Sequence, residues 1–298
     1  MRQLIILGLV GFGAQLIDGS LGMGYGVTST SLLLLAGLTP AAASASVHIS
    51  ELGTNIASGI SHWRLKNVDW RVVARIAGPG AIGAFLGATV LSSLSTEAAA
   101  PIMAAILVVL GAYILIRFVI GIKPTLKKAL TIKFLAPLGL FAGFVDATGG
   151  GGWGPVATPA LLADGRLEPR KVIGTVDTSE FAVSAAASIG FLIGLGAAGI
   201  NWGFALALLI GGLIAAPIAA VLVRYAPAHV LGVAVGGIIL LTNSRTLLKT
   251  FEVETPARFA VYGAIVLVTA IGLSIAIQRS RARKRAAAEA PVEESASV

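Results

Sequence analysis

Long uncharged apolar runs are the feature that most limits how this chain can fold. No charged side chain occurs between Phe181 and Val223, between Ile76 and Thr96, or between Ala98 and Ile116. About 20 consecutive apolar residues are enough to cross a bilayer as a helix. Charged residues make up 12% of the chain, against about 25% in a soluble domain. The sequence therefore predicts an all-α polytopic integral membrane protein.

Cysteine and charge exclude several other classes of protein. The 298 residues contain no cysteine, which excludes disulfides, thiolate metal sites and a cysteine nucleophile. The net charge of +8 comes from residues between the apolar runs and in the tail, where membrane topology signals occur, so nucleic acid is not an expected partner. The histidines His48, His62 and His229 are scattered, and neither a metal site nor a cofactor is expected.

Two pairs of short matching segments indicate an internal duplication. "LIDGSLGMGYGV" (Leu16–Val27) matches "FVDATGGGGWGP" (Phe144–Pro155) at an offset of 128 positions. "VHISE" (Val47–Glu51) matches "VDTSE" (Val176–Glu180) at an offset of 129. The same order at nearly the same offset predicts two membrane repeats. We assign residues 1–125 to the first repeat, 126–250 to the second, 251–278 to an extra transmembrane helix, and 279–298 to a basic, disordered cytoplasmic tail.

Each repeat is predicted to contain a glycine-broken helical hairpin followed by about three full spans. In the first repeat the break lies at Asp18–Gly26, and the spans lie near 41–61, 70–94 and 98–121. In the second repeat the broken segment lies near 134–164, and the spans lie near 171–196, 203–223 and 228–248. The extra C-terminal span is expected near 259–277.

The number of crossings predicts that the two repeats are inverted. If each hairpin returns to its starting side, each half crosses the membrane an odd number of times. With the N-terminus outside, 18 of the 22 Lys and Arg residues fall on the inner side, as the positive-inside rule requires. This arrangement places the C-terminus in the cytoplasm. Inverted repeats with interrupted helices are a recurrent build of secondary transporters.

The glycine clusters are interpreted as breaks that form an anion site. Glycine costs a helix about 1 kcal/mol relative to alanine, and broken backbone within a bilayer is tolerated only where protein surrounds it or it lines a cavity. A half-helix that begins there presents free amides and a positive dipole end to an anion. The alternative is that the glycines serve only close helix packing.

The predicted substrate-binding residues are Gly22, Gly24, Tyr25, Gly150, Gly151, Gly152 and Trp153. Valine at Gly22, Gly24, Gly150 or Gly152 is expected to fill the place of the anion.

Acidic residues within the apolar helices are candidates for coupling or for structural support. Glu51 and Glu180 occupy equivalent repeat positions, with His48 and Asp177 three residues earlier and Asn55 and Ser184 four residues later, so each trio shares a helical face. Intramembrane carboxylates usually mark a pathway. They could carry a coupling proton or accept hydrogen bonds from half-helix amides, and the sequence leaves both roles open.

The aspartates that precede the glycines, Asp18 and Asp146, are expected to cap or brace the loops. No catalytic residue is expected. The glycine clusters lack the Gly-Lys-Ser/Thr ending of a nucleotide loop, and nothing in the sequence brings the two aspartates together as in an aspartyl protease.

At these motifs the sequence resembles the TauE/SafE family of membrane permeases. The resemblance is carried by "DGSLGMGYG" and "DATGGGGWGP", together with "SVHISELGTNIAS" and "GTVDTSEF", and covers roughly residues 5–250. It implies a duplicated helical membrane fold that moves small anions such as sulfite, thiosulfate, sulfonates or sulfoacetate across a bacterial cytoplasmic membrane. The segment "TPAAASASVH" departs from "EPRKVIGTVD" in the second half, which leaves unequal contributions of the two halves open.

The functional hypothesis is a secondary transporter that moves a small, sulfur-containing oxyanion by alternating access, with proton coupling left open. An anion channel with the same site is the nearest alternative. A membrane-embedded enzyme or assembly factor is the alternative from another class. The expected partners are the small anionic substrate and membrane lipid, and homodimer formation is left open.

Overall fold

The computed structural model describes residues 2–121, 130–163, 167–222 and 228–289. Their regular structure is entirely helical. In chain order the elements are α1 (Arg2–Leu21), α2 (Tyr25–Leu35), α3 (Pro40–Arg64), α4 (Trp70–Ser93), α5 (Thr96–Ile120), α6 (Ile132–Gly149), α7 (Trp153–Ala163), α8 (Pro169–Leu195), the 3-10 turn η1 (Ala197–Gly199), α9 (Trp202–Leu222), α10 (Ala228–Thr250) and α11 (Thr255–Glu289).

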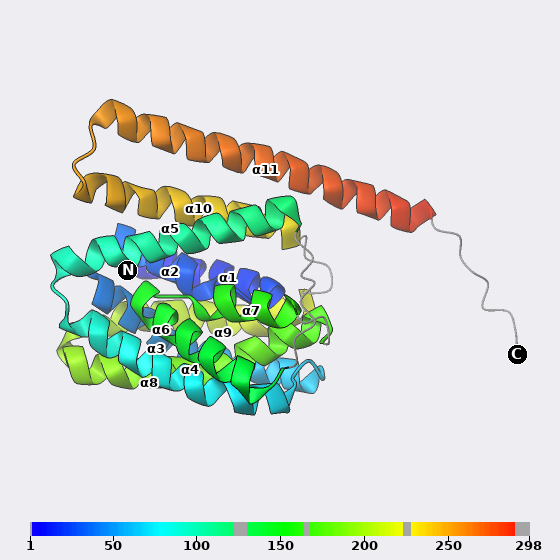
Figure 1. The fold of residues 1–298 in the computed structure, drawn as a ribbon, viewed down its shortest axis with the longest axis horizontal. Coiled ribbons are helices and arrows are strands. Elements are labelled where there is room, and N and C mark those ends of the chain that lie inside the picture. The colour runs from blue at the N-terminus through cyan, green and yellow to red at the C-terminus, as the bar shows by residue number, and fades with distance from the viewer. Residues whose placement is uncertain (1, 122–129, 164–166, 223–227, 290–298) are drawn as a thin grey trace, which may run out of the picture.

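The long helices run in roughly the same direction through one bundle (Figure 1). Among the described residues, seven helices are long and apolar enough to cross a membrane, namely α4, α5, α6, α8, α9, α10 and α11. This confirms the predicted all-α polytopic membrane protein. Helix α3 has the length of a span but is not among the seven, and it carries His48, Glu51 and Asn55 along its buried side.

Local sequence signals explain where several of these helices begin and end. Asp69 precedes α4, and its carboxylate accepts the amides of Arg71 and Val72 at 3.0 and 3.2 Å. The Ser95 hydroxyl accepts the amide of Ala98 at the start of α5, and Gly121 ends that helix with φ of 70°. Side-chain oxygens at N-caps and glycines at left-handed C-caps satisfy backbone groups that a helix end leaves open.

Several closely packed helix pairs join one half of the chain to the other. The first helix of each broken segment packs against a full span of the other repeat: α1 packs along α9, and α6 packs along α4. Helix α3 crosses α8, and α5 lies along α10. Small residues permit this close approach, because a Cβ on Gly143 would collide with the carbonyl of Gly80, and one on Gly211 with the carbonyl of Gly8. Such small-residue contacts are typical of membrane helix pairs.

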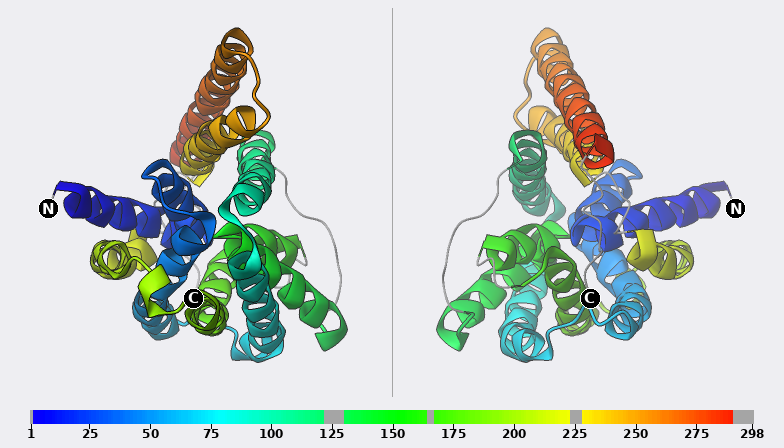
Figure 2. Two further views of the ribbon diagram at one scale, coloured as in Figure 1. Left: turned by 90° about the vertical axis from the view of Figure 1, so that its left-hand side faces the viewer. Right: turned by 90° about the vertical axis from the view of Figure 1, so that its right-hand side faces the viewer.

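The last helix, α11, lies at the periphery, next to α10 and α5 (Figure 2). Only 11% of its most apolar stretch is buried, as suits a helix that faces lipid along most of its surface. The helix continues from the predicted span through Arg279 to Glu289, where the sequence predicts a disordered tail. The remainder of that predicted tail, 290–298, lies outside the described residues.

Candidate functional site

Both glycine clusters break the helix in which they occur, as the sequence predicts. Helix α1 ends at Leu21 and α2 begins at Tyr25, while α6 ends at Gly149 and α7 begins at Trp153. Gly22 and Gly150 occupy equivalent positions and have almost the same backbone angle, φ of 66° and 68°. Only glycine adopts this left-handed conformation readily. The short helices α2 and α7 are mostly buried, so protein rather than lipid surrounds the broken backbone.

The two breaks meet each other inside the bundle. The Thr30 hydroxyl donates to the carbonyl of Gly150, and the Thr158 hydroxyl donates to the carbonyl of Gly22 at 2.5 Å. These two hydrogen bonds join repeat-equivalent pairs, since both threonines lie eight positions after the glycine of their own half. The meeting of the two breaks therefore forms a paired arrangement at the centre of the molecule.

The aspartate before each break caps the half-helix that follows it. Asp18 Oδ1 accepts the amide of Tyr25 at 3.2 Å. Asp146 Oδ1 accepts the amides of Gly152 and Trp153 at 2.6 and 3.0 Å. Both carboxylates are buried. These contacts occupy some of the amides that the sequence argument left open for a substrate.

Few backbone amides remain at the two half-helix starts. The first bond inside α2 runs from Thr28 to Gly24, which leaves Gly26 and Val27 without an acceptor in their own helix. The first bond inside α7 runs from Val156 to Gly152. Pro155 has no N–H, so Gly154 is the one residue at the start of α7 whose N–H group is free. The first half therefore presents more free N–H groups than the second.

The predicted aromatic ligands bond to neighbouring helices. The Tyr25 hydroxyl lies 2.9 Å from Ser50 Oγ on α3. The indole N–H of Trp153 donates to the carbonyl of Val176 on α8 at 3.1 Å. Both side chains are buried. The structure thus places Tyr25 and Trp153 at equivalent positions beside the breaks, where each holds its half-helix to the polar helix of its own repeat.

The Cα atoms of the break glycines face protein. A Cβ on Gly151 would collide with Gly26, and one on Gly152 would lie 2.8 Å from Val145 Cγ1. A Cβ on Gly22 would lie 3.0 Å from Ile173, and one on Gly24 would lie 3.1 Å from Ile17. Valine at these positions would strain the fold as well as any site, so such variants test packing more directly than substrate binding.

Polar side chains of α3 and α8 meet beside the breaks. Ser184 Oγ donates to Glu51 Oε2 at 3.0 Å, and Asn55 Nδ2 donates to Ser184 Oγ at 3.4 Å. Asn55 and Ser184 are repeat equivalents, so the two helices cross at matching points. Glu51 is 2% exposed and contacts the break as well, since a Cβ on Gly26 would lie 3.2 Å from Glu51 Oε1.

His48 and Asp146 form a buried pair. Nε2 of His48 lies 3.0 Å from Asp146 Oδ2, and its Nδ1 lies 2.8 Å from the carbonyl of Ser44. Neither side chain is exposed. The sequence placed Asp146 beside the break and His48 on the polar face of another helix, but gave no reason to pair them, because their contact depends on how α3 packs against α6.

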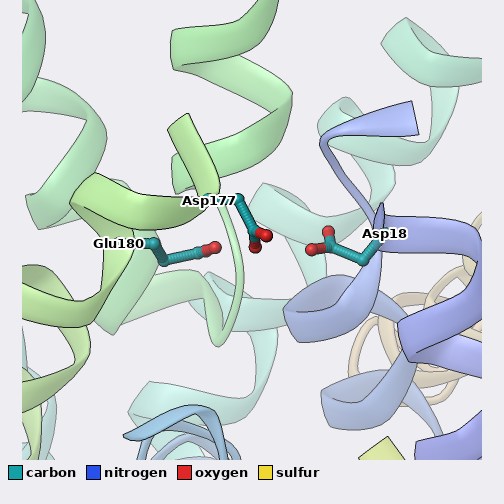
Figure 3. Close-up of side chains that lie close together, drawn as sticks. All are labelled: Asp18, Asp177 and Glu180. Carbon is teal, nitrogen blue, oxygen red and sulfur yellow. The ribbon is translucent and has the colours of Figure 1, made fainter. Parts of the chain in front are cut away.

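Three carboxylates come together on the other side of the site. Asp18 from α1 faces Asp177 and Glu180 from α8, and one oxygen of each lies within 4.8 Å of the others (Figure 3). The Ser58 hydroxyl donates to Asp177 Oδ2. Sequence reasoning placed Asp177 and Glu180 on one helical face but did not bring Asp18 to them. We call Asp18, Asp177 and Glu180 the acidic cluster.

Among the described residues, no lysine or arginine side chain is buried, so none reaches the breaks. Two surface cavities in the described part of the chain are apolar. One lies between α10 and α11, lined by Ile238, Leu241 and Ile265 among others. The second, lined by Ile106, Phe141 and Val156 among others, lies between α5, α6 and α7. Neither offers polar groups for an anion.

Interrupted helices that meet inside a multi-pass bundle, with buried carboxylates around them, are typical of polytopic membrane transporters. A family model described as "Sulfite exporter TauE/SafE" matches residues 7–246. The chain therefore belongs to the TauE/SafE family.

A relative from Bacillus subtilis (strain 168), the "Probable membrane transporter protein YtnM", is 53% identical over 268 residues, which is 89% of each chain. No solved structure matches the chain.

Proposed function

We propose that this membrane transporter is a secondary transporter for a small sulfur-containing oxyanion of the sulfite, thiosulfate, sulfonate or sulfoacetate class. The observation that carries the proposal is the meeting of two interrupted helices within the bundle, where Thr30 and Thr158 join the breaks. Half-helix N-termini are positive and attract anions. The family description supports the sulfur oxyanion class. The proposed setting is the bacterial cytoplasmic membrane, with the C-terminus in the cytoplasm.

The proposed binding position lies where α2 and α7 begin, close to the amides of Gly26, Val27 and Gly154. Gly26 and Gly151 pack backbone against backbone in this structure, so the anion requires the two breaks to separate. Such a separation would occur as one repeat moves against the other during alternating access. The hydroxyls of Thr30 and Thr158, which bridge the breaks, would then become free to donate to the anion.

Radioactive sulfite and thiosulfate flux into liposomes tests the proposal. Purified full-length protein should give saturable uptake that protein-free liposomes lack, and unlabelled sulfonate should compete if it shares the site. A channel would instead give flux that follows the membrane potential and does not saturate in the same range. Absence of flux for every anion of the class would contradict the transporter assignment and favour an enzyme or assembly factor.

Proton coupling predicts a specific effect of neutralising the two glutamates. Glu51→Gln and Glu180→Gln should each abolish the pH dependence of uptake, so that rates at pH 5.5 and 7.5 differ less than twofold. Ionised carboxylates repel an incoming anion, so wild-type uptake should rise as the outer pH falls, and the variants should lose this dependence. Uptake at pH 5.5, 6.5 and 7.5 measures the effect. Wild-type pH dependence in both variants would remove these glutamates from the coupling.

A further inference from the structure

The two repeats differ in charge at positions that the duplication makes equivalent. Asp146 of the second repeat pairs with His48 of the first, at 3.0 Å between Oδ2 and Nε2. The ring centroids of Phe191 and His48 lie 5.9 Å apart. Carried through the repeat offsets, Asp146 corresponds to Asp18, His48 to Asp177, and Phe191 to His62. Asp177 of the acidic cluster therefore takes the place of His48, and the neighbouring His62 takes the place of Phe191.

The acidic cluster lacks the positive partner that its counterpart has. Asp18, Asp177 and Glu180 are at most 9% exposed. The ion pairs of the described residues join no lysine or arginine to them. Three ionised carboxylates this close repel one another strongly in a buried site. A mobile positive charge must therefore neutralise the cluster at least in part.

The surrounding titratable side chains do not supply that charge. Helix α3 contributes Glu51, His48 and His62, and α6 contributes Asp146, to which His48 is already bound. Tyr25 of α2 is hydrogen-bonded to Ser50. The arginines of α4, Arg71 and Arg75, are exposed, and Arg75 donates to the carbonyl of Leu130. His62 is the one imidazole of these helices that faces the cluster.

Two buried atoms without partners show where the charge would move. Asp177 Oδ1 and His62 Nε2 have no hydrogen-bond partner, and His62 Nε2 lies 3.7 Å from Asp177 Oδ2. The amide of Asn67 lies 3.3 Å from His62 Nδ1. When the Asn67 NH₂ group donates to Nδ1, neutral His62 carries its hydrogen on Nε2, facing Asp177. An N–H group can transfer a proton but cannot ligate a metal cation.

We propose that the acidic cluster holds one exchangeable proton that is coupled to anion movement, and that His62 relays this proton. The inference rests on the proposed transport function. His62 is fully buried in the last turn of α3, directly before the exposed residues Trp63 and Arg64. A hydronium ion from water gives its proton to His62 Nδ1, which leaves water and imidazolium and displaces the Asn67 amide. Nε2 then gives its proton to the Asp177 carboxylate, which leaves neutral imidazole with its hydrogen on Nδ1. The His48–Asp146 pair, covered by Phe191, is a fixed brace.

Thiosulfate transport in liposomes with a trapped pH dye tests the relay. Thiosulfate is a suitable probe because it does not itself bind protons near neutral pH. A thiosulfate gradient should drive proton influx through wild-type protein. His62→Phe, which copies the residue at the equivalent position, should slow that influx at least tenfold while thiosulfate exchange at equal concentrations stays within twofold of wild type. Asp177→His should abolish the influx, because it installs a second histidine–aspartate pair. Glu97→Gln, an exposed acid on α5, is the matched control.

Wild-type proton influx through both His62→Phe and Asp177→His would overturn the proposal. So would wild-type uptake that requires Na⁺ and moves no protons.

A measurement without substrate separates this proposal from the transport function. Infrared difference spectra of the protein in lipid membranes, taken after a pH drop, should show the carbonyl band of a protonated carboxyl group. Asp177→Asn should diminish the band, and His62→Phe should delay its appearance at least tenfold. This result would support the proton site even if liposomes moved no thiosulfate. A wild-type spectrum without the band would overturn the proton site even if thiosulfate were transported.

Discussion

Asp18 and Asp146 occupy equivalent positions and cap equivalent amides, yet they face opposite partners. Asp146 Oδ2 lies against the His48 ring, whereas Asp18 faces Asp177 and Glu180 (Figure 3). Neutralising Asp146 removes the partner of a buried imidazole. Neutralising Asp18 removes one of three crowded charges. The same substitution should therefore have different effects at the two positions.

We expect Asp146→Asn to lower the free energy of unfolding by roughly 1–3 kcal/mol, the usual cost of leaving a buried polar group without its partner. Asp18→Asn should cost less, because the asparagine oxygen can still accept the Tyr25 amide while the repulsion within the acidic cluster falls. Denaturant unfolding of both purified variants in one detergent measures the difference. A larger loss for Asp18→Asn would contradict the charge assignment.

The sequence predicted the positions of residues relative to one another where they lie on the same helix. The shared face of Asp177 and Glu180 follows from helical periodicity, and the structure turns both toward Asp18. Contacts between helices, such as Asp18 with Asp177, depend on packing that sequence spacing does not specify. One signal was present in the sequence: extending the 129-residue offset past Glu180 pairs His62 with Phe191, and this difference separates the two halves.

The helix interruptions depend on two factors, the left-handed backbone angle of a glycine and the close packing of side chains around it. Gly150 has φ of 68°, and a Cβ there would lie against the side chain of Thr30. Gly121 has nearly the same left-handed conformation, φ of 70° and ψ of 40° against 68° and 31°, but a Cβ there would make only ordinary contacts at 3.7 Å. This pair separates the cost of a left-handed residue from the cost of filling the contact between the breaks.

Gly121→Ala should lower the free energy of unfolding by about 1–2 kcal/mol, the cost of a left-handed alanine. Gly150→Ala should lower it by that amount plus roughly 1–3 kcal/mol for overpacking and displacement of Thr30. Thermal unfolding of the two variants, followed by tryptophan fluorescence, gives the ranking. Equal losses would show that the breaks tolerate extra volume, and would contradict their close packing.

Helix positions were more predictable than the chemistry of the helix ends. The predicted span near 70–94 corresponds to α4 at Trp70–Ser93, and the span near 98–121 to α5 at Thr96–Ile120. Apolar runs and capping residues determine such bounds. The sequence predicted two half-helix starts whose backbone N–H groups are free to bind an anion. The capping of Tyr25, Gly152 and Trp153 by Asp18 and Asp146 depends on how the chain turns at each break.

For the whole molecule, the exchange of packing partners suggests why a duplicated chain forms one body. Helices α1 and α9 come from different halves, as do α6 and α4, and both pairs pack closely. Neither proposed repeat could keep these contacts alone. The hydrogen bonds of Thr30 to Gly150 and of Thr158 to Gly22 also cross between the halves. Any motion of one repeat against the other must therefore act directly on the breaks.

The proposed inversion of the repeats makes a prediction about membrane sidedness. The ends of α3 and α8 occupy equivalent places in the two halves, at Arg64 and near Ala198. Inversion places them on opposite sides, with Arg64 inside and Ala198 outside. Because the chain has no cysteine, Arg64→Cys and Ala198→Cys each create a unique thiol at an exposed position.

A membrane-impermeant maleimide should label Ala198→Cys in intact cells and Arg64→Cys only after the membrane is opened. Glu252→Cys, in the exposed turn between α10 and α11, should label like Ala198→Cys, since one further span then returns the C-terminus to the cytoplasm. Labelling of Arg64→Cys and Ala198→Cys from the same side would mean that the halves are parallel. In that arrangement the two half-helix starts could not approach the site from opposite sides of the membrane, and alternating access by inverted repeats would no longer explain transport.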